Sequence, residues 1–179
     1  WSWGSNYYGG VGNNSTIDCL SPIQIGALST WSKISPGSTG FILAIQSNGT
    51  LWGWGVNTIG MLGINDTNPR SSPVQVGTST WSVVKAGLSY AAGITTDGKL
   101  FTWGANPNGV LGDATPTIVG GARSSPVQVG TSSWTSVATG SLHVLAIKLG
   151  GLLYAWGANT SGQLGDLTVA VTASRSSPI

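Results

Sequence analysis

The sequence predicts an all-β fold, a β-propeller with four-stranded blades. Three observations predict it. A repeat of about fifty residues runs along the whole chain, each unit holds short strand-like segments, and no stretch has apolar residues at helical spacing. The 28 glycines among 179 residues, with abundant Ser, Thr and Asn, favour strands joined by tight turns over long helices.

A Trp-Gly pair opens each unit. The pairs are separated by 51, 49 and 53 residues, and an Asn and a Gly-x-Leu-Gly segment follow most of them. We expect their tryptophans to be buried between neighbouring blades. The pairs are Trp3-Gly4, Trp54-Gly55, Trp103-Gly104 and Trp156-Gly157. They divide a single predicted domain, 1–179, into the repeats 3–53, 54–102 and 103–155 and a partial repeat 156–179.

The middle of each unit predicts a short strand that begins at a proline. Arg-Ser-Ser-Pro occurs at 70–73, 123–126 and 175–178, while the first unit keeps only Ser21-Pro22. Alternating β-branched runs such as Val74-Gln75-Val76 follow. A proline fits the first strand position because that residue can lack an N–H partner.

The second half of each unit predicts a hairpin. A second tryptophan opens this half and marks a further strand, at Trp31, Trp81 and Trp134. An apolar run then leads into a two-residue turn of the kind that accepts positive φ, at Asn48-Gly49, Asp97-Gly98 and Gly150-Gly151. The returning strand ends on the next Trp-Gly. About four short strands per fifty residues is the signature of a propeller blade.

These residues together resemble the RCC1 (regulator of chromosome condensation) repeat family. The matching pattern is Trp-Gly-x-Asn-x-x-Gly-x-Leu-Gly, then Ser-Pro-Val, then Val-x-x-Gly-x-x-His-x-x-Ala-Ile-x-x-Asp-Gly-x-Leu-x-x-Trp-Gly. It covers the whole chain as three full units and one half unit. The resemblance implies a seven-bladed propeller, of which this chain would hold about 3.5 blades.

The chain departs from the family pattern in ways that bear on function. The family histidine occurs only as His143, Tyr90 fills that position in the second unit, and the first unit has a one-residue insertion within 38–41. Founding members of the family act as guanine-nucleotide exchange factors through an inserted hairpin and acidic residues. This chain has no such insertion and no Glu. Its near-uniform units look more like the RCC1-type repeats of bacterial surface and phage proteins.

Charge is scarce, with seven Lys and Arg and five Asp. Arg70, Arg123 and Arg175 recur once per unit, so a propeller would place them around a ring. They are either turn arginines in solvent or a ligand-contact ring for an anionic group. Binding of nucleic acid is not expected, because it usually needs clustered cations. Membrane insertion is not expected either, because no apolar run reaches roughly 18 residues.

The sequence predicts no catalytic, cofactor or metal site. His143 is the one histidine, and we expect a structural role with a ring nitrogen bonded to backbone. Asp66, Asp113 and Asp166 are lone acids in separate units, which favours turn-capping aspartates over a calcium site. The lone Cys19 excludes a disulfide framework, and we expect it to be inert in a loop. All nine tryptophans follow the repeat, which favours packing over a ligand platform.

The leading functional hypothesis is a non-enzymatic structural or interaction module that binds a protein or surface ligand through its blade loops. We expect it on a virion, as in a phage tail or fibre, or on a cell surface. The alternatives are an intracellular exchange-factor propeller and a propeller lectin or hydrolase. The chain begins as a strand ends, since 1–4 matches 52–55. We therefore expect further blades of the same chain, further copies of it, or an open array to cover its blade faces.

Overall fold

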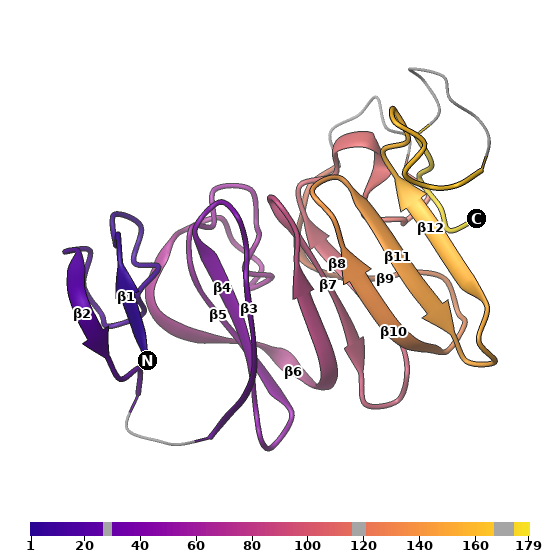
Figure 1. Cartoon of the computed structure of the whole chain (residues 1–179). Helices are drawn as coiled ribbons and strands as arrows, with labels where there is room; N and C mark the ends of the chain where they lie inside the picture. Colours follow the sequence, from indigo (N-terminus) through magenta and orange to yellow (C-terminus); the bar gives the residue numbers. More distant parts are fainter. Residues whose placement is uncertain (27–29, 116–120, 167–173) are drawn as a thin grey trace.

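The computed structural model describes residues 1–26, 30–115, 121–166 and 174–179, and the part described is all-β, which confirms the predicted fold class. A single short 3-10 turn, Pro107–Gly109, interrupts the strands of these residues. The strands are β1 (Ser2–Gly4), β2 (Cys19–Ile23), β3 (Trp31–Pro36), β4 (Phe41–Gln46), β5 (Thr50–Gly55), β6 (Arg70–Ala86), β7 (Tyr90–Thr95), β8 (Leu100–Gly104), β9 (Arg123–Gln128), β10 (Trp134–Thr139), β11 (His143–Lys148) and β12 (Leu153–Gly157). Figure 1 shows the sheets standing side by side in chain order, as the blades of a propeller do.

Each blade is an antiparallel meander. The first blade contains β3, β4 and β5 and the beginning of β6, and the second contains the end of β6, β7, β8 and β9. The 17-residue strand β6 serves both blades, because Gln75 pairs with β5 while Trp81 pairs with β7. Repeat 54–102 therefore supplies the fourth strand of one blade and the first three strands of the next.

The two ends of the chain carry a third blade and a smaller sheet. Strands β10, β11 and β12 form the third blade, and a bridge between Gly157 and Arg175 begins its fourth strand. Strands β1 and β2 form a two-stranded sheet with the register Ser2↔Ile23 and Gly4↔Cys19. The same register joins Gly53 to Val74 and Gly55 to Arg70 in the first blade, so β1 and β2 correspond to β5 and the start of β6.

The hydrophobic core lies between blades. Successive strand residues point to opposite faces of a sheet, so each blade buries one set of side chains against each neighbour. We call the face that packs on the next blade the front face and the opposite face the back face. In the first blade the front face presents Phe41, Leu43, Ile45 and Leu51, and in the second blade the back face presents Trp81, Val84, Ala91 and Trp103. These residues form one buried cluster, and a second cluster joins the second blade to the third in the same way.

Turns lie at the predicted places between the second and third strands of each blade, but only Gly150-Gly151 has positive φ at both residues of the predicted pair; in the first two blades the glycine alone has it, and the residues between the bonded groups are 47–48 and 96–97. Gly49 and Gly98 have φ of +85° and +83°, and their amides donate to the carbonyls of Gln46 and Thr95. Within the described residues, no helix has the length and apolarity that crossing a membrane requires.

Candidate interaction surface

The tryptophans of the Trp-Gly pairs tie each blade to the unit before it. Their indole nitrogens donate to carbonyl oxygens of that unit: Trp54 to Gly10 at 3.0 Å, Trp103 to Met61 at 2.9 Å and Trp156 to Val110 at 2.9 Å. All three tryptophans are buried between blades.

Trp3 differs from the other Trp-Gly tryptophans. Its side chain is 60% exposed, so the expectation of burial is wrong at this position. The described residues include no earlier unit whose Gly-x-Leu-Gly loop could pack on it.

The glycines of the Trp-Gly pairs have positive φ. A Cβ on Gly104 would lie 2.7 Å from the carbonyl oxygen of Ser89, so a larger residue does not fit there.

The second set of tryptophans packs edge-on or tilted against aromatic residues of its own blade. Trp81 contacts Phe101 and Trp103, and Trp134 makes the corresponding contacts in the third blade. Trp31 is only half-buried, and its indole nitrogen donates to the carbonyl of Ile25 at 3.1 Å.

A cation contact in the third blade was missed by sequence reasoning. The Lys148 ammonium lies 3.9 Å from the centroid of Tyr154 and 5.3 Å from that of Trp134. Gln46 and Thr95 occupy the position of Lys148 in the other blades. A lysine that replaces neutral residues at a repeated position, beside two aromatic residues, is the sequence feature that could have indicated this contact. A cation over aromatic rings adds modest stability to a blade.

The asparagine after each Trp-Gly pair organises the loop that follows. Asn57 is fully buried; its Oδ1 accepts from the Leu62 amide at 2.9 Å, and its Nδ2 donates to the carbonyls of Asp66 and Asn68. Asn6, Asn106 and Asn159 accept the corresponding amide in their own loops. The side chain of this recurring asparagine is therefore engaged in hydrogen bonds within its own loop.

The repeated arginines pair with the aspartates of their own loops. Arg70 lies 2.5 Å from Asp66, Arg123 lies 2.9 Å from Asp113, and Arg175 lies 2.8 Å from Asp166. The arginine side chains keep 28% to 34% of their surface exposed. Each charge is thus balanced within its loop, and a role for the arginines as a ring for an anionic ligand stays a prediction.

The aspartates also brace their turns. The Asp66 and Asp113 carboxylates accept backbone amides two residues on, which is the turn-capping geometry expected for them. Among the described residues, no three His, Cys, Asp or Glu side chains come close enough to hold a metal ion.

The first unit replaces the ion pair with neutral groups. Cys19 occupies the position of Arg70 and lies in β2, so its placement in a loop was wrong. The Asn13 amide lies 3.4 Å from the Cys19 sulfur, where the other units have their ion pair. The arginine is lost in this unit, and the acid that its loop keeps, Asp18, accepts the Asn6 amide instead.

The repeat position that carries histidine in the family pattern is occupied by a different ring-bearing residue in each blade. Phe41, Tyr90 and His143 pair with Gly55, Gly104 and Gly157 in the same register, so the insertion in the first unit lies in the turn before Phe41. The Tyr90 hydroxyl lies 2.9 Å from the Gly140 carbonyl and 2.7 Å from the His143 carbonyl of the next blade. Burial raises the pKa of Tyr90. A backbone bond from the His143 ring stays a prediction.

Every acid of the chain has a local partner. Asp18 accepts the Asn6 amide at 2.8 Å, and three aspartates hold the arginines. The fifth, Asp97, lies 2.8 Å from the Lys99 ammonium. Bonds from Lys99 and Thr95 lower the pKa of Asp97 to about 2.

Two loop ends expose large apolar side chains at positions where the units differ in sequence. Tyr7 and Tyr8 are 75% and 46% exposed and stack edge to face at 4.7 Å, at a loop position where the next unit has Thr58-Ile59. The turn between β11 and β12 carries Leu149 and Leu152, both exposed, at positions where the first blade has Ser47 and Thr50. These loop ends are the candidate interaction surface.

Family models give independent matches over most of the chain. One model, described as "Regulator of chromosome condensation (RCC1) repeat", matches residues 1–42, 48–93 and 97–147. A second model of the same description matches residues 82–110 and 134–163.

Known proteins are similar over nearly the whole chain. The ultraviolet-B receptor UVR8 of Arabidopsis thaliana is 31% identical over 172 residues, which are 92% of this chain and 38% of UVR8. The chain thus spans about two fifths of that relative. Human WBSCR16 superposes with a TM-score of 0.80 at 20% identity, over 99% of this chain and 46% of WBSCR16.

A yeast structure shares the same fold. Prp20p of Saccharomyces cerevisiae, described with its binding properties to Gsp1p and histones, superposes with a TM-score of 0.73 at 19% identity. The superposition covers 93% of this chain and 42% of Prp20p. At these identities the two structural matches establish the propeller fold and no more.

Proposed function

Because this chain belongs to the regulator of chromosome condensation (RCC1) repeat family, we propose that it is a non-enzymatic propeller module that binds a protein partner through the loops at its blade ends. One observation carries the proposal. The asparagine that recurs in every unit and the arginine–aspartate pairs are bound within their own loops, while Tyr7, Tyr8, Leu149 and Leu152 are exposed at loop positions where the other units hold different residues.

The exposed loop residues have the chemistry of protein contacts. Tyrosine and leucine supply large contact areas, and tyrosine is enriched among residues that dominate binding energy. Tyr7 and Tyr8 are not needed by the fold, because the corresponding loop of the next unit holds Thr58-Ile59 and closes with the same backbone bond, from the glycine amide to the asparagine carbonyl. The protein interactions named for Prp20p support the same class of function.

The proposed location is a virion, such as a phage tail or fibre, or a cell surface. The support for it is compositional: charged residues make up 7% of the chain, Glu is absent, and Ser and Thr are abundant. The proposed lack of catalysis is supported by the local pairing of all five acids and by the single His143 and Cys19.

A comparison of surface variants tests the proposal. The chain is immobilised and exposed to an extract of the source cells, and retained proteins are compared between the native chain and two variants, Tyr7→Ser with Tyr8→Ser and Leu149→Ser with Leu152→Ser. We expect a specific partner to be lost with at least one variant and kept with the control Ser141→Ala. Turnover of esters, glycosides or nucleotides that disappears with His143→Ala would contradict the non-enzymatic assignment.

A further inference from the structure

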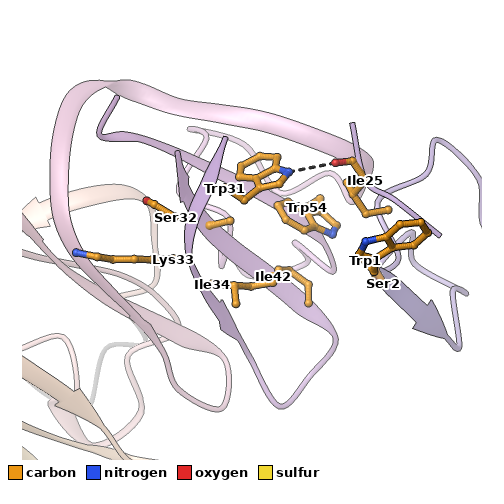
Figure 2. A pocket seen from close by; sticks show the side chains of 10 residues that line it. Trp1, Ser2, Ile25, Trp31, Ser32, Lys33, Ile34, Ile42 and Trp54 are labelled. Atoms are coloured by element: carbon orange, nitrogen blue, oxygen red, sulfur yellow. Dashed lines mark hydrogen bonds between the residues drawn. The ribbon is translucent and has the colours of Figure 1, made fainter. Parts of the chain in front are cut away.

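Each blade places a tryptophan of its first strand edge to face with an aromatic residue of its third strand. The pairs are Trp31 with Trp52, Trp81 with Phe101, and Trp134 with Tyr154. Figure 2 shows Trp31 in the first blade, where its ring also lies beside Trp54. The three pairs share one strand register, so the surroundings of the third-strand ring can be compared between blades.

In the first and third blades a side chain of the same blade engages the third-strand ring. The Trp52 indole nitrogen donates to the Thr50 hydroxyl oxygen at 2.9 Å. The Lys148 ammonium lies 3.9 Å from the centroid of Tyr154. The third blade thus shows that a cation fits over the ring at this place in the fold.

The second blade has neither contact. Thr95 stands at the position of Lys148, but it is too short to extend over Phe101, and its hydroxyl donates to Asp97. Lys99 stands at the position of Thr50, and its ammonium lies 2.8 Å from the Asp97 carboxylate. Phe101 therefore lies on the wall of an open hollow of about 430 Å³.

The hollow offers an acid as well as a ring. Its lining comes from the link 78–80 and from the second blade, in the middle of the chain, and includes the Asp97 carboxylate beside Phe101. The side chains of Asp97 and Lys99 are 56% and 53% exposed, and an ion pair as exposed as this one contributes little. The carboxylate can therefore accept a second ammonium. Gly150 stands at the position of Asp97 in the third blade, so the second blade holds one more group for a cation.

We propose that this hollow receives a lysine side chain of a partner protein, with the ammonium over the Phe101 ring and beside the Asp97 carboxylate. The contact of Lys148 with Tyr154 and Trp134 is its counterpart within the chain. Lysine suits the hollow because its long stem can lie along apolar surface while the ammonium reaches a ring face. The inference goes beyond the loop contacts proposed above and rests on the proposed function only in taking its ligand from a protein.

The probe is the peptide acetyl-Gly-Lys-Gly-amide, titrated into the nitrogen-15-labelled 179-residue chain and followed by NMR. We expect saturable shifts of the backbone amides of residues 95–101. In the matched peptide, norleucine replaces lysine and keeps the hydrocarbon stem without the charge. Its affinity should be lower by about two- to thirty-fold, the range that a cation over an aromatic ring provides.

Three variants of the chain distinguish a cation site from a general surface. Thr95→Lys should abolish binding, because it gives Phe101 the ammonium that the third blade already gives to its own ring. Asp97→Asn should weaken binding and Lys99→Ala should strengthen it, since the first removes the carboxylate and the second removes the competing ammonium. The control is Asn48→Ala, at the corresponding turn of the first blade, and it should leave the affinity unchanged.

The variants should fold, because the first blade has Asn48 at the position of Asp97 and the third blade has lysine at the position of Thr95. Circular dichroism checks this, and Asp97→Asn, at an exposed turn, keeps the test decisive if Thr95→Lys unfolds. The proposal is overturned by the absence of saturable shifts at 95–101, by equal affinity for the norleucine peptide, or by unchanged binding with Asp97→Asn. Such a failure leaves the loop contacts of the proposed function standing, because the peptide test involves neither loop.

Discussion

The indole nitrogen of Trp103 donates a hydrogen bond to the carbonyl oxygen of Met61, 2.9 Å away and 42 residues earlier in the chain. The bond joins the third strand of the second blade to the loop between the third and fourth strands of the first blade. Since the side chain is fully buried and also contacts Trp81, a single residue serves the core, the blade and the junction between blades. Trp54 and Trp156 combine the same burial, aromatic contact and hydrogen bond in their units, which accounts for the recurrence of tryptophan at this position.

Trp103→Ala is expected to destabilise the chain by about 3–5 kcal/mol, because it removes a fully buried aromatic side chain and leaves a cavity. Urea unfolding followed by far-UV circular dichroism gives the free energy of unfolding. Trp3→Ala is the matched control: its side chain is 60% exposed, and it should cost far less. A similar loss in the two variants would contradict the packing described for Trp103.

Gly63→Ala should destabilise the chain by more than the change of backbone conformation alone. Gly63 has φ of +73°, and a Cβ there would lie 2.8 Å from the indole nitrogen of Trp103. The left-handed backbone costs about 1–2 kcal/mol for alanine. Gly77→Ala isolates that contribution, because Gly77 has φ of +57° and open space around its Cβ position. Equal losses in the two variants, measured by thermal unfolding, would show that Trp103 moves aside without cost.

Much of the fold could be predicted because the same structural signals recur in every repeat. Trp-Gly pairs, turn glycines and alternating runs each have a local physical meaning, and their recurrence fixes the number of strands per unit. The sequence could not reveal that β6 continues through two blades, because the residues between its two halves have no distinctive pattern. Nor could it show that Trp3 lies exposed, since burial depends on which unit packs on it.

The candidate surface was harder to predict than the scaffold. Arg123, the first residue of β9, pairs with Asp113 ten residues earlier, and no periodic rule predicts that pairing. The exposure of Ile34 could not be predicted either, because Ile34 has the same apolar character as Val84, and only the arrangement of the blades leaves one exposed and the other covered. Repetition predicts what the units share, whereas a binding surface depends on what they do not share.

Arg123→Ala is expected to reduce the free energy of unfolding by about 1–3 kcal/mol. The Asp113 side chain is 4% exposed, so removing its partner leaves a buried carboxylate, while the 32% exposure of Arg123 keeps the loss below that of a fully buried pair. The double variant with Asp113→Asn should recover part of the loss. Additive losses in a double-mutant cycle would rule out coupling between the two charges.

The lowered pKa of Asp97 predicts that the free energy of unfolding decreases at acid pH. Its folded pKa of about 2 lies below the ordinary value near 3.9, so its bonds stabilise the native state above pH 4 and are lost as the pH falls toward 2. Lys99→Ala should raise the pKa of Asp97, measured by NMR titration of the carboxyl carbon, because Lys99 is the largest cause of the lowered value. An unchanged titration in that variant would show that Lys99 does not hold the carboxylate in solution.

Tyr90→Phe is expected to cost about 1–2 kcal/mol, because the hydroxyl meets the carbonyls of Gly140 and His143 across the junction between the second and third blades. The ring itself should be tolerated, since Phe41 fills the same position in the first blade. Chemical denaturation at neutral pH measures the loss. Thermal unfolding followed by fluorescence of the tryptophans at blade junctions provides an independent readout.

Tyr90→Phe should also change how the free energy of unfolding depends on alkaline pH, which a purely steric change would not do. Burial holds the folded pKa of Tyr90 above its ordinary value of 10.0, so the unfolded chain releases this proton first. The contribution of Tyr90 to stability is therefore complete below pH 10 and declines as the pH rises beyond it. The free energy of unfolding of Tyr90→Phe should fall less steeply above pH 10 than that of the native chain. Parallel slopes for the two proteins would show that Tyr90 ionises as easily in the folded chain as in the unfolded one.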